Sequence, residues 1–328
     1  MREAVVVAYG RSAIGKSPKG TLKDTRPEEY AAQVIKGTLA KVPTFNPALI
    51  DDLILGCAFQ EAETGTNVAR NIGFLAGIPE TVPAQTVNRF CSSGLQAIAM
   101  GANSIMAGQA DIVLAGGVET MSMVPMGGNL NVPNVKLGTE IMPTAMTAMG
   151  NTAENVAVKY GITREEQDEF AYNSHKKAEA AQAAGKFDDE IITVDAVKYK
   201  MDYETGHVVK YTEPFNKDEG IRYGMTYEEM QKLKPAFIPK VGTVTAGNAS
   251  QMNDAAAAVV IMSREKADAL GLKPIAKFVS FTVAGCEPDY MGIGPVYAIP
   301  KALKIAGLTM DDISVFELNE AFAAQALA

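Results

Sequence analysis

Cysteine is scarce in this chain of 328 residues, which contains only Cys57, Cys91 and Cys286. Three scattered cysteines are too few for a disulfide framework. None belongs to a Cys-x-x-Cys pair, so nothing in their spacing indicates a zinc or redox site. We therefore expect no metal site and a reducing compartment, the cytoplasm.

Long apolar runs are also absent. The first apolar stretch, residues 4–8, becomes polar again too soon for the hydrophobic part of a signal peptide. No later stretch approaches the about 20 apolar residues that span a membrane. The net charge of -8 would repel nucleic acid and anionic membrane surfaces. We expect a soluble protein with neither nucleic acid nor a membrane as its partner.

What is present is a globular composition, with 47% hydrophobic and 21% charged residues. The length suits about two domains. Residues 4–8 predict a strand, residues 28–40 predict a helix after Pro27, and residues 53–55 predict a second strand. Strands that alternate with helices indicate parallel βαβ units, and so the α/β class.

A similar order returns near the end of the chain. Residues 274–281 are strand-like, residues 295–306 are helical, and two aspartates precede an apolar pair at 315–316, much as Asp51 and Asp52 precede the strand at 53–55. This favours an internal duplication over a chance likeness between two βα units. The second half would then stop roughly 60 residues before it matches the first.

The middle of the chain differs in composition. From residue 121 to about residue 247 it is rich in Met, Asn, Pro and charged residues, and it predicts one clear helix at 163–184. Thr163 and Glu166 have the spacing of a capping box at the start of that helix. We interpret this region as a loop domain inserted into an α/β core.

Cys91 is placed between an extended run that ends near Val87 and residues 95–105, whose apolar side chains recur at helical spacing. A cysteine at the start of a helix is favoured as the nucleophilic thiolate by the helix dipole, and the nearby N–H groups could cradle an oxyanion. The alternative role is that of a small buried apolar side chain, which we expect for Cys57 and Cys286.

Several stretches of the sequence, one of them around Cys91, carry a family resemblance. Residues 88–97 read Asn-Arg-Phe-Cys-Ser-Ser-Gly-Leu-Gln-Ala, and residues 116–122 read Gly-Gly-Val-Glu-Thr-Met-Ser. Residues 242–250 read Gly-Thr-Val-Thr-Ala-Gly-Asn-Ala-Ser, and residues 319–323 read Asn-Glu-Ala-Phe-Ala. Across its whole length the chain resembles the thiolases.

The resemblance implies the duplicated αβαβα layered fold of that family. In it, residues 1–120 and 246–270 form the N-terminal domain with the nucleophile. Residues 121–245 form the loop domain for coenzyme A binding and oligomer contacts, and residues 271–328 form part of the C-terminal domain. Since thiolases are generally dimers or dimers of dimers, we expect a homodimer or a homotetramer.

The resemblance also implies a reaction. Thiolases cleave 3-ketoacyl-CoA, or condense acyl groups in reverse, and Cys91 matches the cysteine that carries the acyl group as a thioester. Asn319 matches the residue that orders a water at one oxyanion site. Coenzyme A (CoA) is a substrate, and no tightly bound cofactor is expected.

Further motif positions imply a CoA site. Ser250 and the backbone from Ala246 to Ala249 match positions along the pantetheine arm. The side chains expected near that arm are Phe237, Met149 and Phe322. Arg222 matches a position near the nucleotide, where the phosphates need positive charge.

Two catalytic motifs of the family do not occur in this sequence: the Gly-His-Pro motif and the second cysteine in a Cys-x-Gly-Gly-Gly loop. We expect His175 and His207 to be exposed and to serve as no substitute. Residues 1–328 alone are therefore expected to be inactive, or to be a fragment that binds CoA without turnover. A ketoacyl synthase is disfavoured, because that family lacks the Asn-Glu-Ala-Phe motif.

The choice of substrate rests on a departure from the biosynthetic thiolases. Where those enzymes commonly have a histidine, this chain has Ala148. The motifs at 89–94 and 289–295 also resemble those of the degradative branch. We therefore expect a degradative 3-ketoacyl-CoA thiolase of fatty acid β-oxidation, with a biosynthetic acetyl-CoA acetyltransferase as the alternative.

Overall fold

The computed structural model describes residues 2–328, which divide into two compact units. Unit 1 contains the residues up to 131 together with 187–220 and 252–278, and unit 2 contains 132–186, 221–251 and 279–328. No helix in residues 2–328 is long and apolar enough to span a membrane. The three-domain division expected from the sequence stays a prediction.

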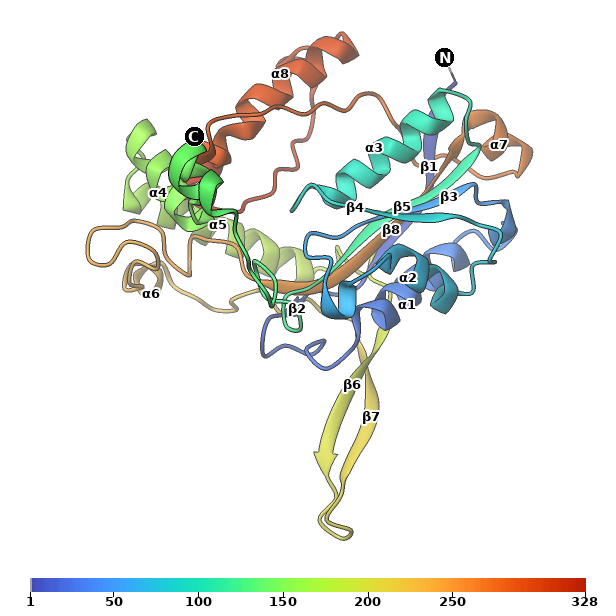
Figure 1. The fold of residues 1–328 in the computed structure, drawn as a ribbon, viewed down its shortest axis with the longest axis horizontal. Coiled ribbons are helices and arrows are strands. Elements are labelled where there is room, and N and C mark those ends of the chain that lie inside the picture. The colour runs from blue at the N-terminus through green and yellow to red at the C-terminus, as the bar shows by residue number, and fades with distance from the viewer. Residues whose placement is uncertain (1) are drawn as a thin grey trace. The chain divides into compact units, whose positions relative to one another are not determined.

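Unit 1 is built on a mixed β-sheet (Figure 1). Its strands are β1 (Ala4–Arg11), β2 (Gly15–Lys16), β3 (Asp52–Gly56), β4 (Ala84–Val87), β5 (Ile112–Thr120), β8 (Asn253–Ser263) and β9 (Ala276–Lys277). They are ordered β4-β3-β5-β8-β1-β9, with β2 beside β8. As the sequence predicts, β3 is parallel to β4 and β5, whereas β8 runs antiparallel to β5 and β1.

Helices cover both faces of this sheet. They are α1 (Pro27–Ala40), α2 (Val68–Ala76) and α3 (Ser93–Met106), with the short α7 (Arg264–Ala269) after β8. Successive side chains of a strand point to opposite faces. Leu53 and Leu55 accordingly join the core cluster that contains residues of α1 and α2, and Ile54 joins the cluster that contains residues of α3. This buries β3 on both faces.

Residues 187–220 of unit 1 include a separate antiparallel hairpin, β6 (Val194–Met201) and β7 (Val208–Phe215) (Figure 1). Unit 2 is helical in the residues described: α4 (Met149–Tyr160), α5 (Arg164–Ala183), α6 (Tyr227–Gln231), α8 (Gly294–Ala306) and α9 (Ala323–Leu327). The predicted capping box is confirmed, because Thr163 and Glu166 exchange side-chain and backbone hydrogen bonds at the start of α5.

Two predicted elements near the C-terminus differ from the structure. Of residues 274–281, only Ala276–Lys277 form a strand, where they pair with β1. Residues 315–316 form no strand, and Val315 is 77% exposed. A strand is defined by hydrogen bonds to a neighbour, and within residues 2–328 no strand runs beside this segment. The predicted helix at 295–306 is confirmed as α8.

Candidate active site

Cys91 lies in unit 1, in the turn between the end of β4 at Val87 and the start of α3 at Ser93. Its side chain is exposed, and the strand-to-helix position predicted from the sequence is confirmed. Phe90, the residue before it, has a φ of +46°, a left-handed conformation that is strained for a bulky side chain. The turn therefore presents Cys91 just before the N-terminal end of α3, where the helix dipole favours negative charge.

Side-chain hydrogen bonds hold this turn. The Ser93 hydroxyl accepts from the backbone N–H of Arg89 at 2.8 Å and donates to the carbonyl oxygen of Phe90 at 2.5 Å. The side-chain oxygen of Asn88 accepts from the N–H of Phe90 at 2.8 Å, and its amide nitrogen donates to the carbonyl of Ala58 at 2.8 Å. The strained conformation of Phe90 is thus fixed by its neighbours on both sides.

Cys57 has a very different environment at the end of β3. Cys57 is buried. Burial is the main cause that raises the pKa of its thiol to about 12, and the negative charge of the neighbouring Glu119 is the second. Glu119 is also partly desolvated, which raises the pKa of its carboxyl group. Its carboxylate accepts hydrogen bonds from the N–H groups of Ala58 at 2.7 Å and Phe59 at 3.4 Å. Cys57 is therefore the small buried side chain expected.

Cys286, in unit 2, is only half buried, so the expectation of full burial is wrong for it. Its sulfur lies 3.9 Å from the carbonyl oxygens of Tyr290 and Met291, and partial burial raises the pKa of its thiol. Both carbonyls belong to the short 3-10 helix Pro288–Ile293, which covers only part of the thiol.

The apolar residues expected near the pantetheine arm gather in unit 2. Phe322 is 8% exposed and belongs to one apolar cluster with Met149 and Ala249. The rings of Phe237 and Phe322 are packed edge to face, with centroids 6.1 Å apart. Phe237 is 40% exposed, so one wall of this cluster remains open to solvent.

The segment with Ser250 is paired with the segment that follows Asn319. The N–H of Ser250 donates to the carbonyl of Ala321 at 2.8 Å, and the N–H of Ala323 donates to the carbonyl of Asn248 at 2.9 Å. Ser250, Ala246 and Asn319 are all exposed. Two motifs that are about 70 residues apart in the sequence thus form one structural element of unit 2, as backbone pairing between distant segments allows.

Arg222 contacts the same segment, since its guanidinium group donates to the carbonyl oxygen of Ala246 at 2.8 Å. His175 is next to it and is half buried, so its predicted exposure is wrong. Burial lowers the pKa of His175, and the positive charge of Arg222 lowers it further. The charged composition of α5 did not show this, because the residues near His175, Arg222 and Gly247, are distant from it in the sequence. His207 is exposed in a turn, as expected.

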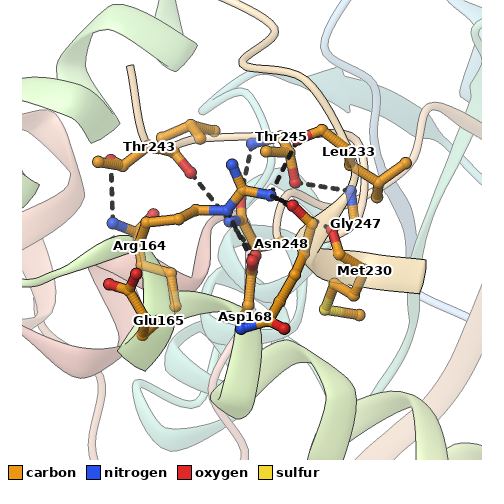
Figure 2. A network of polar contacts seen from close by, with 12 residues as sticks. Arg164, Glu165, Asp168, Met230, Leu233, Thr243, Thr245, Gly247 and Asn248 are labelled. Atoms are coloured by element: carbon orange, nitrogen blue, oxygen red, sulfur yellow. Dashed lines mark hydrogen bonds and ion pairs between the residues drawn. The ribbon is translucent and has the colours of Figure 1, made fainter. Parts of the chain in front are cut away.

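A buried polar network under this segment was not anticipated from the sequence. Arg164 and Asp168 of α5 form an ion pair at 2.6 Å, and Asp168 accepts a further hydrogen bond from Asn248 at 2.9 Å (Figure 2). Glu154 of α4 accepts hydrogen bonds from the N–H groups of Thr243 and Val244. The separation of four residues between Arg164 and Asp168 was a signal for the ion pair, but not for its burial.

Comparisons with known proteins identify the family. Residues 4–265 match the model of the thiolase N-terminal domain, and residues 272–328 match that of the thiolase C-terminal domain. The chain belongs to the thiolase family. A 3-ketoacyl-CoA thiolase of Bacillus subtilis is 53% identical over 100% of this chain and 83% of that protein. One from Saccharophagus degradans is 48% identical over 99% of this chain and 81% of that protein.

Solved thiolase structures agree with the fold. The acetyl-CoA acetyltransferase of Bacillus anthracis superposes with a TM-score of 0.86 at 40% identity, over 100% of this chain and 82% of that one. Human mitochondrial 3-ketoacyl-CoA thiolase superposes with a TM-score of 0.85 at 37% identity, over 99% of this chain and 82% of that one. The thiolase α/β fold expected for this chain is confirmed. The alignments give no support to the expectation that residues 1–328 alone are inactive.

Proposed function

We propose that this thiolase is an acyltransferase of the degradative type, which cleaves 3-ketoacyl-CoA with CoA. The observation that carries the proposal is Cys91, an exposed thiol in a strained turn at the start of α3, in a chain that is 53% identical to a 3-ketoacyl-CoA thiolase. Cys57 is buried, which raises the pKa of its thiol to about 12, and partial burial raises the pKa of the Cys286 thiol, so both observations favour Cys91.

The reaction has two half-reactions. The thiolate of Cys91 attacks the 3-keto carbon, a carbon–sulfur bond forms, and the bond between carbons 2 and 3 breaks. The electron pair of that bond leaves on carbon 2, which takes up a proton to give acetyl-CoA. The thiolate of CoA then attacks the acyl–Cys91 thioester, which yields the shortened acyl-CoA and frees Cys91.

The residues around CoA are part of the proposal. We assign the pantetheine arm to Ser250, Ala246 and Ala249, the apolar wall to Met149, Phe237 and Phe322, and the nucleotide to Arg222. Asn319 is assigned to the water of an oxyanion site. The pairing of residues 248–250 with 321–323 supports this assignment, since it brings the two motifs into one element. CoA acts as a substrate, with no tightly bound cofactor.

The test is thiolysis of 3-ketoacyl-CoA substrates of increasing chain length by the protein and by its Cys91→Ser variant. The protein is expected to release acetyl-CoA, and the variant to lose at least about a thousandfold in rate, as expected when a covalent nucleophile is removed. After incubation with acetyl-CoA, peptide mass spectrometry should find one acetyl group on Cys91. Turnover by Cys91→Ser at the rate of the wild type would exclude this mechanism.

The 40% identity to an acetyl-CoA acetyltransferase favours a second candidate, the formation of acetoacetyl-CoA. The residue that separates the candidates is Ala148, at the N-cap of α4. The family resemblance implies that biosynthetic thiolases commonly have a histidine at this position. The degradative assignment predicts cleavage of substrates longer than acetoacetyl-CoA. Activity restricted to acetoacetyl-CoA and acetyl-CoA would instead support the second candidate.

The setting of the enzyme also belongs to this proposal. We expect a cytoplasmic homodimer or homotetramer, because thiolases generally assemble in this way. Light scattering after size exclusion measures the assembly, and fractionation of the source cells measures the location.

A further inference from the structure

Asp168 is a charged residue whose side chain is 0% exposed, on α5 of unit 2. Burial raises the pKa of its carboxyl group, and the hydrogen bonds from Arg164 and Asn248 oppose this rise. An ionised carboxylate in the interior is costly unless it is paired and hydrogen-bonded. The partners of Asp168 therefore indicate which parts of the unit it holds in place.

The two carboxylate oxygens of Asp168 have different partners. One accepts from Nε of Arg164 at 2.6 Å, one turn earlier on the same helix. The other accepts from Nδ2 of Asn248 at 2.9 Å. Figure 2 shows this carboxylate between the helix and the 243–250 segment. Asp168 thus connects α5 to the segment that contains Ser250.

Asn248 in turn organises that segment. Its side-chain oxygen accepts from the N–H of Thr245 at 2.7 Å, and its Nδ2 also donates to the carbonyl of Thr243 at 3.0 Å. The hydroxyl of Thr245 accepts from the N–H of Gly247 at 3.1 Å. The side-chain amide of Asn248 therefore helps to hold the turn from 243 to 248, together with Thr245 and with Glu154 of α4, and Asp168 accepts a hydrogen bond from the same amide.

Arg164 extends the same connection to a second stretch of chain. Its Nη2 donates to three carbonyl oxygens at the end of α6 and just after it, those of Met230 at 3.2 Å, Gln231 at 3.3 Å and Leu233 at 2.9 Å. Carbonyls at the end of a helix lack partners within the helix. Beyond them, the N–H of Ala236 donates to the carbonyl of Val244 at 2.9 Å. The Arg164–Asp168 ion pair thus contacts both the stretch that leads to Phe237, through Arg164, and the stretch that leads to Ser250, through Asp168.

We propose that Asp168 is a positioning residue for CoA: through Asn248 and Arg164 it holds residues 243–250 in the conformation that the pantetheine arm requires. This inference rests on the proposed function, because it takes the CoA site from that proposal. Asp168 does not touch the substrate. Loss of its carboxylate is expected to weaken CoA binding while it leaves the chemistry at Cys91 intact.

The test compares Asp168→Asn with the matched control Glu169→Gln, which changes the next residue of the same helix at an exposed position. In Asp168→Asn, the KM for CoA is expected to rise about tenfold, because a buried hydrogen-bond donor loses its charged acceptor. The kcat is expected to stay within about twofold of the wild-type value. The Kd for CoA from calorimetry should rise with KM. Alkylation of Cys91 by iodoacetamide, a reagent without a CoA moiety, should keep its rate.

An unchanged Kd for CoA in a folded Asp168→Asn protein would overturn the positioning role. If Asp168→Asn does not fold, Arg164→Lys tests the positioning role instead. Lysine keeps the positive charge but lacks the guanidinium group, whose Nη2 donates to three carbonyls. The KM of Arg164→Lys for CoA is expected to rise about threefold. An unchanged KM would overturn the positioning role. If the wild-type protein itself shows no CoA binding, the proposed function fails and the inference fails with it.

Discussion

Gly56, the last residue of β3, approaches the first turn of α3 so closely that a Cβ atom there would lie 2.3 Å from the carbonyl carbon of Ser93. The same Cβ would lie 2.5 Å from the backbone nitrogen of Gly94. Both are main-chain atoms at the start of the helix, and so they can move only if the helix moves. The turn with Cys91 therefore depends on the absence of a side chain on a neighbouring strand.

Gly56→Ala is expected to destabilise the protein by about 1–3 kcal/mol, the usual cost of overpacking a close contact, and to reduce the alkylation rate of Cys91. The melting temperature and the labelling rate of Cys91 measure the two effects. Gly285→Ala is the matched control, since a Cβ at Gly285 meets nothing within 4 Å. Equal melting temperatures for the two variants would contradict the close contact.

Alkylation should distinguish the cysteines of the native protein. Because burial raises the pKa of Cys57 to about 12, this thiol stays protonated and covered at neutral pH, whereas Cys91 is exposed. Iodoacetamide is expected to label Cys91 and to leave Cys57 unlabelled until the protein is denatured. Peptide mapping before and after denaturation measures this. Rapid labelling of Cys57 in the folded protein would contradict its burial.

Glu119 should make stability depend on pH. Burial raises the pKa of its carboxyl group above the ordinary value of 4.5, so the folded state favours the protonated form. The protonated carboxyl group therefore contributes to the free energy of unfolding. This contribution is fully present below pH 4.5 and is lost as the pH rises through the folded-state pKa. The melting temperature of the wild type, relative to Glu119→Gln, is therefore expected to fall as the pH is raised from 4.5 toward neutrality.

Differential scanning fluorimetry over this pH range measures the difference between the two proteins. Glu80→Gln is the control, because Glu80 is exposed in the same unit. A constant difference between the wild type and Glu119→Gln across the range would show that the pKa of Glu119 is not raised.

Arg222 is expected to strengthen the binding of substrates that carry the nucleotide of CoA. Arg222→Ala is expected to raise the KM for CoA about tenfold, because a charge-assisted contact to phosphate is lost. It should raise the KM for N-acetylcysteamine thioesters less, since these lack the nucleotide and are affected only through the lost hydrogen bond to Ala246. Lys234→Ala removes an exposed cation of the same unit and serves as the control. Equal effects of Arg222→Ala on both kinds of substrate would contradict a nucleotide role.

Much of this protein could be predicted from the sequence because the signals are local. The apolar run at residues 4–8 and the alternation of strands with helices depend on the period of each element, which neighbouring residues determine. The capping box of Thr163 and Glu166 spans a single turn. The motif around Cys91 is likewise one continuous stretch. It identified both the strand-to-helix turn and the family before any packing was known.

Other properties depended on segments that are distant in the sequence. Asp168 and His175 are on a helix whose composition predicts exposure, yet residues 222–248 cover both of them. The strand expected at 315–316 does not form, because a strand needs a paired neighbour as well as a propensity. The sequence alone predicted Cys91 as the nucleophile and determined the type of most elements. Only the tertiary structure decided which charges are buried and what they hold, because burial depends on the segments that pack against a side chain.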